Sequence, residues 1–263
     1  MVGGIKGIAR RPFNGDKRIG SRHAYLLDQL TKRGCKPKVD RYNNIWVVKG
    51  SGTPFRLFSS HYDVDPRIRQ LVFRYQNDGN RRIMLGVLDN AVGCYINMLL
   101  AQKGPKKGRA IYIFTASEEI KRNHPRMFAR SAREIVKQLK KRKIHPDYCV
   151  TVDVTYPKLL HPQENLNWDQ SYEKLFDVND TTHCYVDGFS RPVSRRLGVE
   201  VVKRFKSPKV AVRDFHGHDE AIVYDHLCPS FAFGPVVYGH FDKPEQMMPL
   251  AHLQTALRFL RRL

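Results

Sequence analysis

The sequence has no long hydrophobic run. Nowhere in its 263 residues does an uninterrupted apolar stretch approach the roughly eighteen residues that a membrane-spanning helix needs. Residues 1–15 carry Lys6, Arg10 and Arg11 and contain no apolar run that could serve as a signal peptide. We therefore expect a soluble protein that is made without export and that has no contact with a membrane.

Cysteine is scarce, and its five residues show no C-x-x-C spacing. They are Cys35, Cys94, Cys149, Cys184 and Cys228. An odd number without a metal-binding or redox spacing predicts free thiols in a reducing compartment. This favours an intracellular location, with the cytoplasm as the first choice, and none of the five stands in a pattern typical of a nucleophile.

Acidic residues are much less frequent than basic residues. The chain has 25 Asp and Glu against 46 Lys and Arg, which gives a net charge of +21 and a field that attracts polyanions. The excess peaks at 121–143, where Glu134 is the only acidic residue. Apolar residues recur there at helical spacing, at Phe128, Ala132, Ile135, Val136 and Leu139. The pattern predicts an amphipathic helix, and its basic face is either simply solvated or a contact for nucleic acid or another acidic surface.

The composition, with 41% hydrophobic and 27% charged residues, is that of a globular protein and excludes a disordered or fibrous chain. The sequence shows no internal repeat, low-complexity tract or linker, so we expect 1–263 to form one domain. Helices are predicted at 21–33, 90–102, within 121–143, at 192–205, shortly after 218 and from 244 onward. Strands are predicted at 36–40, 44–49, 55–60, 70–75, 81–85, 110–115, 148–154, 209–213 and 230–234. This alternation indicates an α/β fold, with a mixed, mostly parallel sheet and helices on both faces.

Polar residues follow several predicted strands at the points where those strands end. They are His61, Asp89, Glu118, Glu119, Asp153 and His240. Each one alone is typical of a polar loop, a surface charge or a turn cap. In an open α/β sheet, however, the carboxyl ends of the strands border one crevice. The recurrence of such residues after apolar runs therefore predicts that they share one site.

Four carboxylates in one site would repel one another strongly, and cations relieve that repulsion. Imidazole and carboxylate ligands without a thiolate suit Zn²⁺ best, with Mn²⁺ or Co²⁺ as substitutes. Five ligands shared by two ions give fewer than three for each ion. One carboxylate is therefore expected to bridge both ions. We therefore expect two divalent metal ions as the cofactor.

Six segments carry a family resemblance. They are H-Y-D-V-D-P at 61–66, L-G-V-L-D-N-A-V-G at 85–93, F-T-A-S-E-E-I at 114–120, V-T-V-D-V-T at 150–155, G-H-D-E-A at 217–221, and 233–240, which ends in G-H. Together they resemble the co-catalytic di-zinc exopeptidase superfamily. Its members include leucyl aminopeptidase, tripeptidase T, the glutamate carboxypeptidases and the tetrahedral aminopeptidases. The match runs from about residue 21 to the last residue.

The resemblance implies a role for each position. One ion takes His61, Asp153 and one oxygen of Asp89, and the other takes Glu119, His240 and the second oxygen of Asp89. Asp63 orients the imidazole of His61, and Glu118 is the general base that activates a hydroxide bridging the ions. It also implies a cis peptide bond between Asp89 and Asn90. His252 is the fallback for His240.

The spacing of the motifs leaves no room for the lid or dimerisation domain of larger relatives. Only 27 residues lie between His61 and Asp89, and 63 lie between Asp153 and Gly217. We expect a single compact catalytic domain, with 156–189 as an irregular insertion at the rim of the site.

The leading hypothesis is an aminopeptidase that acts on a peptide. A deacylase or carboxypeptidase acting on an N-acyl amino acid is the enzyme alternative, because the sequence does not separate the two. The other alternative is a non-catalytic basic scaffold or nucleic-acid-associated protein on a retired peptidase fold. The sequence does not indicate the oligomeric state.

Overall fold

A computed structural model describes residues 2–13, 21–79, 81–119, 128–156, 182–214, 220–239 and 243–263. Its central sheet has eight strands in the order β1-β2-β6-β3-β7-β10-β8-β9. They are β1 (Lys38–Val39), β2 (Ile45–Gly50), β3 (Phe55–His61), β6 (Arg109–Thr115), β7 (Tyr148–Val152), β8 (Cys184–Asp187), β9 (Val210–Val212) and β10 (Ser230–Pro235). The run β6-β3-β7-β10 is parallel, and antiparallel pairings flank it at β2 and β8. The predicted mixed, mostly parallel sheet is confirmed.

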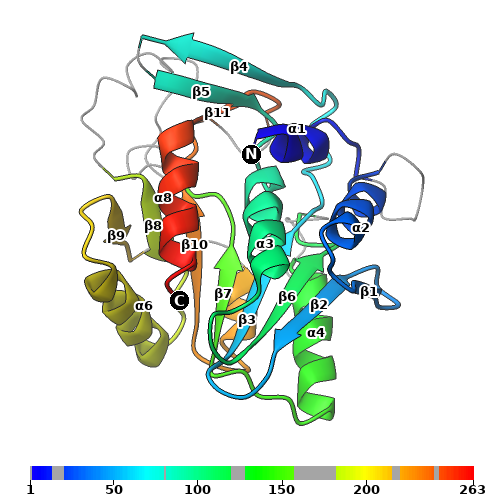
Figure 1. Cartoon of the computed structure of the whole chain (residues 1–263), viewed down its shortest axis with the longest axis vertical. Helices are drawn as coiled ribbons and strands as arrows, with labels where there is room; N and C mark the ends of the chain where they lie inside the picture. The colour runs from blue at the N-terminus through cyan, green and yellow to red at the C-terminus, as the bar shows by residue number, and fades with distance from the viewer. Residues whose placement is uncertain are drawn as a thin grey trace.

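Helices cover both faces of this sheet, because its central strands are apolar on both sides. Leu57 of β3 packs into a cluster with α4 (Arg130–Lys141) and α7 (Glu220–Tyr224). The next residue, Phe58, points to the opposite cluster. That cluster holds α1 (Val2–Ala9), α2 (Arg22–Lys32), α3 (Ala91–Lys103), α6 (Pro192–Phe205) and α8 (Leu250–Leu260). Successive strand residues face opposite sides, so near-continuous hydrophobic strands can support a helical layer on each (Figure 1).

Capping residues fix the ends of two helices where the sequence predicts them. The Ser21 hydroxyl accepts a hydrogen bond from the amide of Ala24 and caps α2, and Gly34, with φ of +72°, follows the end of that helix. The Asn90 side chain accepts from the amide of Gly93 and caps α3. The predicted helices at 21–33 and 90–102 are therefore confirmed.

A second sheet lies apart from the first, at the top of Figure 1. It has the order β11-β5-β4, made of β4 (Phe73–Asp78), β5 (Arg81–Gly86) and β11 (Gln246–Pro249). The predicted hairpin is confirmed in β4 and β5. The helix predicted from 244 is wrong at its start, because residues 246–249 pair as a strand with β5 and α8 begins only at Leu250.

Two further elements differ from the sequence prediction. Helix α1 was missed because its glycines disfavour a helix, yet a Cβ on Gly4 or Gly7 would lie 2.4 Å from Tyr95 or 2.1 Å from Tyr25. Packing against the buried ring of Tyr95 therefore requires glycine at Gly4, whereas at Gly7 only the outer end of the Tyr25 side chain would have to move. Strand β8 lies in 156–189, which was predicted as an irregular insertion at the rim of the site, and of that segment 157–181 lies outside the described residues.

All five cysteines are free, as predicted, and all five are buried. Among the described helices, none is long and apolar enough to cross a membrane.

The contact between β10 and α8 offers a test of the packing. Phe233 stacks on Phe259 with ring centroids 4.4 Å apart, and both side chains are buried. We expect Phe233→Ala to lower the free energy of unfolding by about 3–5 kcal/mol, since it removes buried area and leaves a cavity. The control is Val48→Thr, at a strand position that is 49% exposed, which should change it by less than about 0.5 kcal/mol. Urea denaturation measures the free energy of unfolding of both variants. Equal small losses in the two would contradict the packing of Phe233 on Phe259.

Candidate metal centre

The carboxyl ends of three neighbouring strands bring the candidate ligands together. His61 is the last residue of β3, Glu118 and Glu119 follow β6, and Asp153 directly follows β7. These strands are adjacent in the sheet, so their ends meet at one edge. Asp89 reaches the same place from the segment between β5 and α3. All five side chains are buried.

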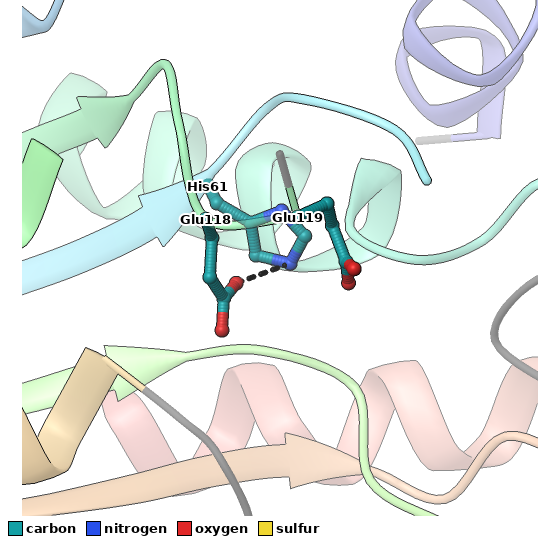
Figure 2. A group of neighbouring side chains, drawn as sticks. All are labelled: His61, Glu118 and Glu119. Atoms are coloured by element: carbon teal, nitrogen blue, oxygen red, sulfur yellow. Dashed lines mark ion pairs between the residues drawn. The ribbon is translucent and has the colours of Figure 1, made fainter. Parts of the chain in front are cut away.

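The imidazole of His61 lies at the centre of this group. Its Nε2 is 2.9 Å from Glu118 Oε2, 3.1 Å from Asp89 Oδ1 and 3.4 Å from Asp153 Oδ2. Two sets of ligand atoms lie within 4.8 Å of one another, one on His61, Asp89 and Asp153 and the other on His61, Glu118 and Glu119. Figure 2 shows the second set, with Glu118 and Glu119 on the same loop beside the imidazole of His61. The structure thus brings together every predicted ligand that it describes.

Asp63 links the histidine to the glutamate loop. Its Oδ1 lies 3.2 Å from His61 Nδ1, and its Oδ2 accepts hydrogen bonds from the amides of Glu118 and Glu119 at 2.9 and 2.8 Å. In the neutral imidazole that would bind a metal ion, a carboxylate beside Nδ1 favours the proton on that nitrogen and leaves the Nε2 lone pair facing the cluster. One fully buried side chain therefore fixes three of the candidate residues.

Asp89 is held from three directions. The Oε1 of Gln246, on β11, accepts from the amides of Leu88 and Asp89 at 2.7 and 2.8 Å. The Tyr156 hydroxyl donates to Asp89 Oδ2 at 3.1 Å. The peptide bond to Asn90 is cis, as the resemblance predicted, and the Asn90 side chain donates to the carbonyl of Val152, next to Asp153.

Burial dominates the electrostatics of the cluster. It raises the pKa of Glu118 well above its usual range, and it also raises that of Asp153, where the charge of Asp89 adds to the shift. Burial lowers the pKa of His61, but the charges of Glu118 and Asp153 outweigh it and raise that pKa well above 6.5. The buried carboxylates therefore need nearby positive charge to remain ionised together.

The donor set fits divalent cations. His61 Nε2 and Glu118 Oε2 are buried and lie 2.9 Å apart, and among the described residues neither atom makes a hydrogen bond. A cation bound between such atoms would satisfy both and offset the cost of burying the carboxylate. Imidazole nitrogen and carboxylate oxygen are ligands that zinc accepts.

The sequence offers two histidines, His240 and His252, for the remaining ligand position. His240, the predicted fifth ligand, lies outside the described residues. Its fallback, His252, is on α8, where its Nδ1 is 2.9 Å from the carbonyl oxygen of Val236 and its ring lies 4.6 Å from that of His183. Among the described residues it belongs to neither set of clustered ligand atoms, so nothing in the described structure supports His252 as the alternative ligand.

Glu220 had no role assigned from the sequence. It is fully buried on α7, and its Oε2 accepts from the hydroxyl of Ser59, which also lies 3.0 Å from the Tyr224 hydroxyl. Burial raises the pKa of Glu220 to about 7, although the charge of His61 favours its ionised form. Its position after G-H-D was the one signal that could have drawn attention to it, whereas Tyr156 and Gln246 stand in no recognisable pattern.

Comparison with solved structures extends the description of the fold. A scan against protein-family models and a search of curated proteins find no match. The TET aminopeptidase of Thaumarchaeota archaeon SCGC AB-539-E09 superposes with a TM-score of 0.70 at 13% identity, over 98% of this chain and 93% of its own. Aminopeptidase APDkam598 of Desulfurococcus kamchatkensis gives 0.68 at 11% identity, over 98% and 92%.

The TET1 peptidase of Pyrococcus horikoshii, which can assemble into a tetrahedron or a large octahedral shell, gives a TM-score of 0.65 at 11% identity, over 91% of this chain and 93% of its own. The fold is similar to that of the tetrahedral aminopeptidases. This confirms, at the level of fold, the resemblance drawn from the sequence motifs. The cluster around His61 thus lies in a tetrahedral-aminopeptidase-like fold.

Protonation of His252 predicts a pH dependence of stability. Burial lowers its pKa to about 4, against about 6.5 in the unfolded chain. Between these values the unfolded state binds more protons, so the contribution is complete above about pH 6.5 and is lost as the pH falls toward 4. Relative to a His252→Leu variant, the wild type should lose about 3 kcal/mol over this range. Urea denaturation at several pH values measures the difference, and parallel curves for the two proteins would contradict it.

Proposed function

We propose that the chain is a metal-dependent hydrolase of peptide bonds, most simply an aminopeptidase. The observation that carries the proposal is the buried cluster of one imidazole and four carboxylates at the carboxyl edge of the central strands. Similarity to proteins described as aminopeptidases supports this choice. Because their sequences are only 11–13% identical to this chain, the activity itself requires an experiment.

Two divalent ions are the proposed cofactor, with zinc first and manganese or cobalt as substitutes. His61 and Asp153 would hold one, Glu119 and His240 the other, and Asp89 would bridge them. Bound ions of this kind lower the pKa of water and polarise the carbonyl of the bond to be cleaved. The short distances from His61 to Asp89 and Asp153 support the first of these sites.

Glu118 is the proposed general base. It is buried beside His61, and its raised pKa suits a carboxylate that accepts a proton from water and then gives it to the leaving amine. Water supplies the oxygen that forms the new carboxylate, and the amine leaves with the transferred proton. Asp63 is a positioning residue in this scheme, since it binds the amides of Glu118 and Glu119 and faces His61.

The alternatives differ in how well they suit the cluster. A deacylase or carboxypeptidase acting on an N-acyl amino acid would use the same ligands and a different rim, and 157–181 of the predicted rim lies outside the described residues. A non-catalytic scaffold has no need for a buried group of repelling carboxylates, which would cost stability unless something compensated them.

An intracellular location stays a prediction from the cysteine content.

Replacing Glu118 tests the assignment of the base. Glu118→Gln keeps the size of the side chain and removes its ability to take a proton, so we expect kcat on aminoacyl substrates to fall by about 10²–10⁴. Bound metal, measured by mass spectrometry, should be unchanged. The control is Glu200→Gln on the exposed side of α6, which should leave both values at wild-type levels. Normal turnover in Glu118→Gln would rule out this role.

Removing metal tests the cofactor. Treatment with a chelator should abolish activity and lower the thermal midpoint, because the cluster loses the cations that offset its repulsion. Zinc at about a hundredfold excess over its Kd should restore about 2.7 kcal/mol per site. About two ions per chain are expected in the native protein, and fewer in His61→Ala. If the zinc-replete protein binds no metal ions, a non-catalytic scaffold is the better-supported function.

A further inference from the structure

Helix α4 has two sides of opposite character. Ala132, Ile135 and Leu139 are buried in the cluster beneath the sheet, as the sequence predicted. The other side carries five exposed cations, Arg130, Arg133, Lys137, Lys140 and Lys141, which we term the basic face of α4. At about 100° per residue, they fall within a sector of about 100° opposite the buried side.

Four of the five cations on this face are not balanced by an ion pair among the described residues. Within the part of the chain that the structure describes, Arg130, Lys137, Lys140 and Lys141 take part in none of the ion pairs. The helix itself contributes one acidic residue, Glu134, which is half-buried. Cations that lie close together on one side of a helix repel one another, so the arrangement lowers stability unless an anion covers it.

Helix α6 provides the contrast within the same molecule. It is also rich in basic residues, but Arg195 pairs with Asp214 and Arg204 pairs with Glu200. It packs in the cluster on the opposite face of the sheet from α4. Among the described residues, the absence of ion pairs at Arg130, Lys137, Lys140 and Lys141 therefore contrasts with the pairing of Arg195 and Arg204.

We propose that the basic face of α4 binds the phosphate backbone of a nucleic-acid duplex without regard to sequence. Lysine and arginine that neutralise phosphates and release counterions supply this kind of binding. A protein partner is less well matched, because the large exposed hydrophobic residues in the described part of the chain are Val39, Val48 and Val193, all outside α4. A membrane surface is also poorly matched, since the apolar side of α4 is buried in the core. A single strand would favour aromatic stacking residues, and the basic face has none.

Only the carboxyl end of the basic face lies away from the candidate metal centre. The start of α4 lies near the loop after β6, because the amide of Ser131 donates to the carbonyl of Ser117. The helix then leads back to the amino end of β7 at Tyr148, which pairs with Arg56 near the start of β3. Lys140 and Lys141 therefore lie toward the edge opposite the candidate ligands. Substitutions at this end test duplex binding without changing the surroundings of His61.

The experiment uses the full chain and a fluorescently labelled 20-base-pair DNA duplex, with anisotropy measured between 50 and 200 mM salt. If four cations each neutralise one phosphate, the logarithm of the affinity should fall with that of the salt concentration at a slope of about −3.6, a loss of roughly a hundredfold. Two unrelated duplex sequences should bind within about threefold of each other. Removing three cations in K137Q/K140Q/K141Q should flatten the slope by about 2.7 and weaken binding at least about tenfold at 100 mM.

The control is R196Q/K203Q/R204Q on α6, which changes the net charge by the same amount. We expect it to weaken binding by less than about threefold, and both variants to keep the circular dichroism and peptidase activity of the wild type. Equal losses in the two variants would assign binding to net charge and overturn the proposal. So would an absence of duplex binding at 50 mM salt, or poly-glutamate that competes as well as the duplex. None of these outcomes bears on the proposed peptidase, which is judged by metal content and Glu118→Gln.

Discussion

Concentration of negative charge in a buried place is the constraint on which the structure of the site depends. Four carboxylates approach one imidazole where little water is available to screen them, and burial shifts the pKa of Glu118 and Asp153 upward. A folded chain tolerates such a group only if the backbone enforces it and something positive shares the space. The parallel strands supply the first condition, since β6, β3 and β7 end side by side.

The supporting contacts explain how flexible carboxylates keep their places. Asp63 binds both amides of the glutamate pair, and Gln246 binds the two amides at Asp89. In each case a side chain fixes a backbone segment, and the backbone then directs the ligand. Such contacts make the ligand geometry depend on residues that touch no substrate, as is usual around metal sites in proteins.

Much of the fold follows from sequence periodicity. The apolar runs in β3, β6 and β7 and the caps at Ser21 and Asn90 are local signals, so their elements could be predicted. Helix α1, β8 and β11 could not, because each depends on a neighbour far along the chain. Gly4, for example, weakens a helix in isolation and is needed only because Tyr95 packs against it.

The residues of the candidate site also divide into those that the sequence indicates and those that it does not. Residues that follow apolar strands, such as His61 and Asp153, carry a signal in their position. Tyr156 and Gln246 do not, since a tyrosine and a glutamine are ordinary in any loop or strand and gain meaning only from the contact with Asp89 or its amide. Sequence reasoning therefore finds the groups that face a ligand more readily than the groups that hold them.

Strand β11 also has a consequence for the order in which the molecule assembles. Gln246, which anchors the backbone at Asp89, lies more than 150 residues further along the chain. During synthesis, the early strands and the glutamate loop leave the ribosome well before this anchor. Asp89 can therefore take the position seen here only once Gln246 has reached it, and Gln246 is held by the pairing of β11 with β5. A late part of the chain thus completes the support of a candidate ligand that is made much earlier.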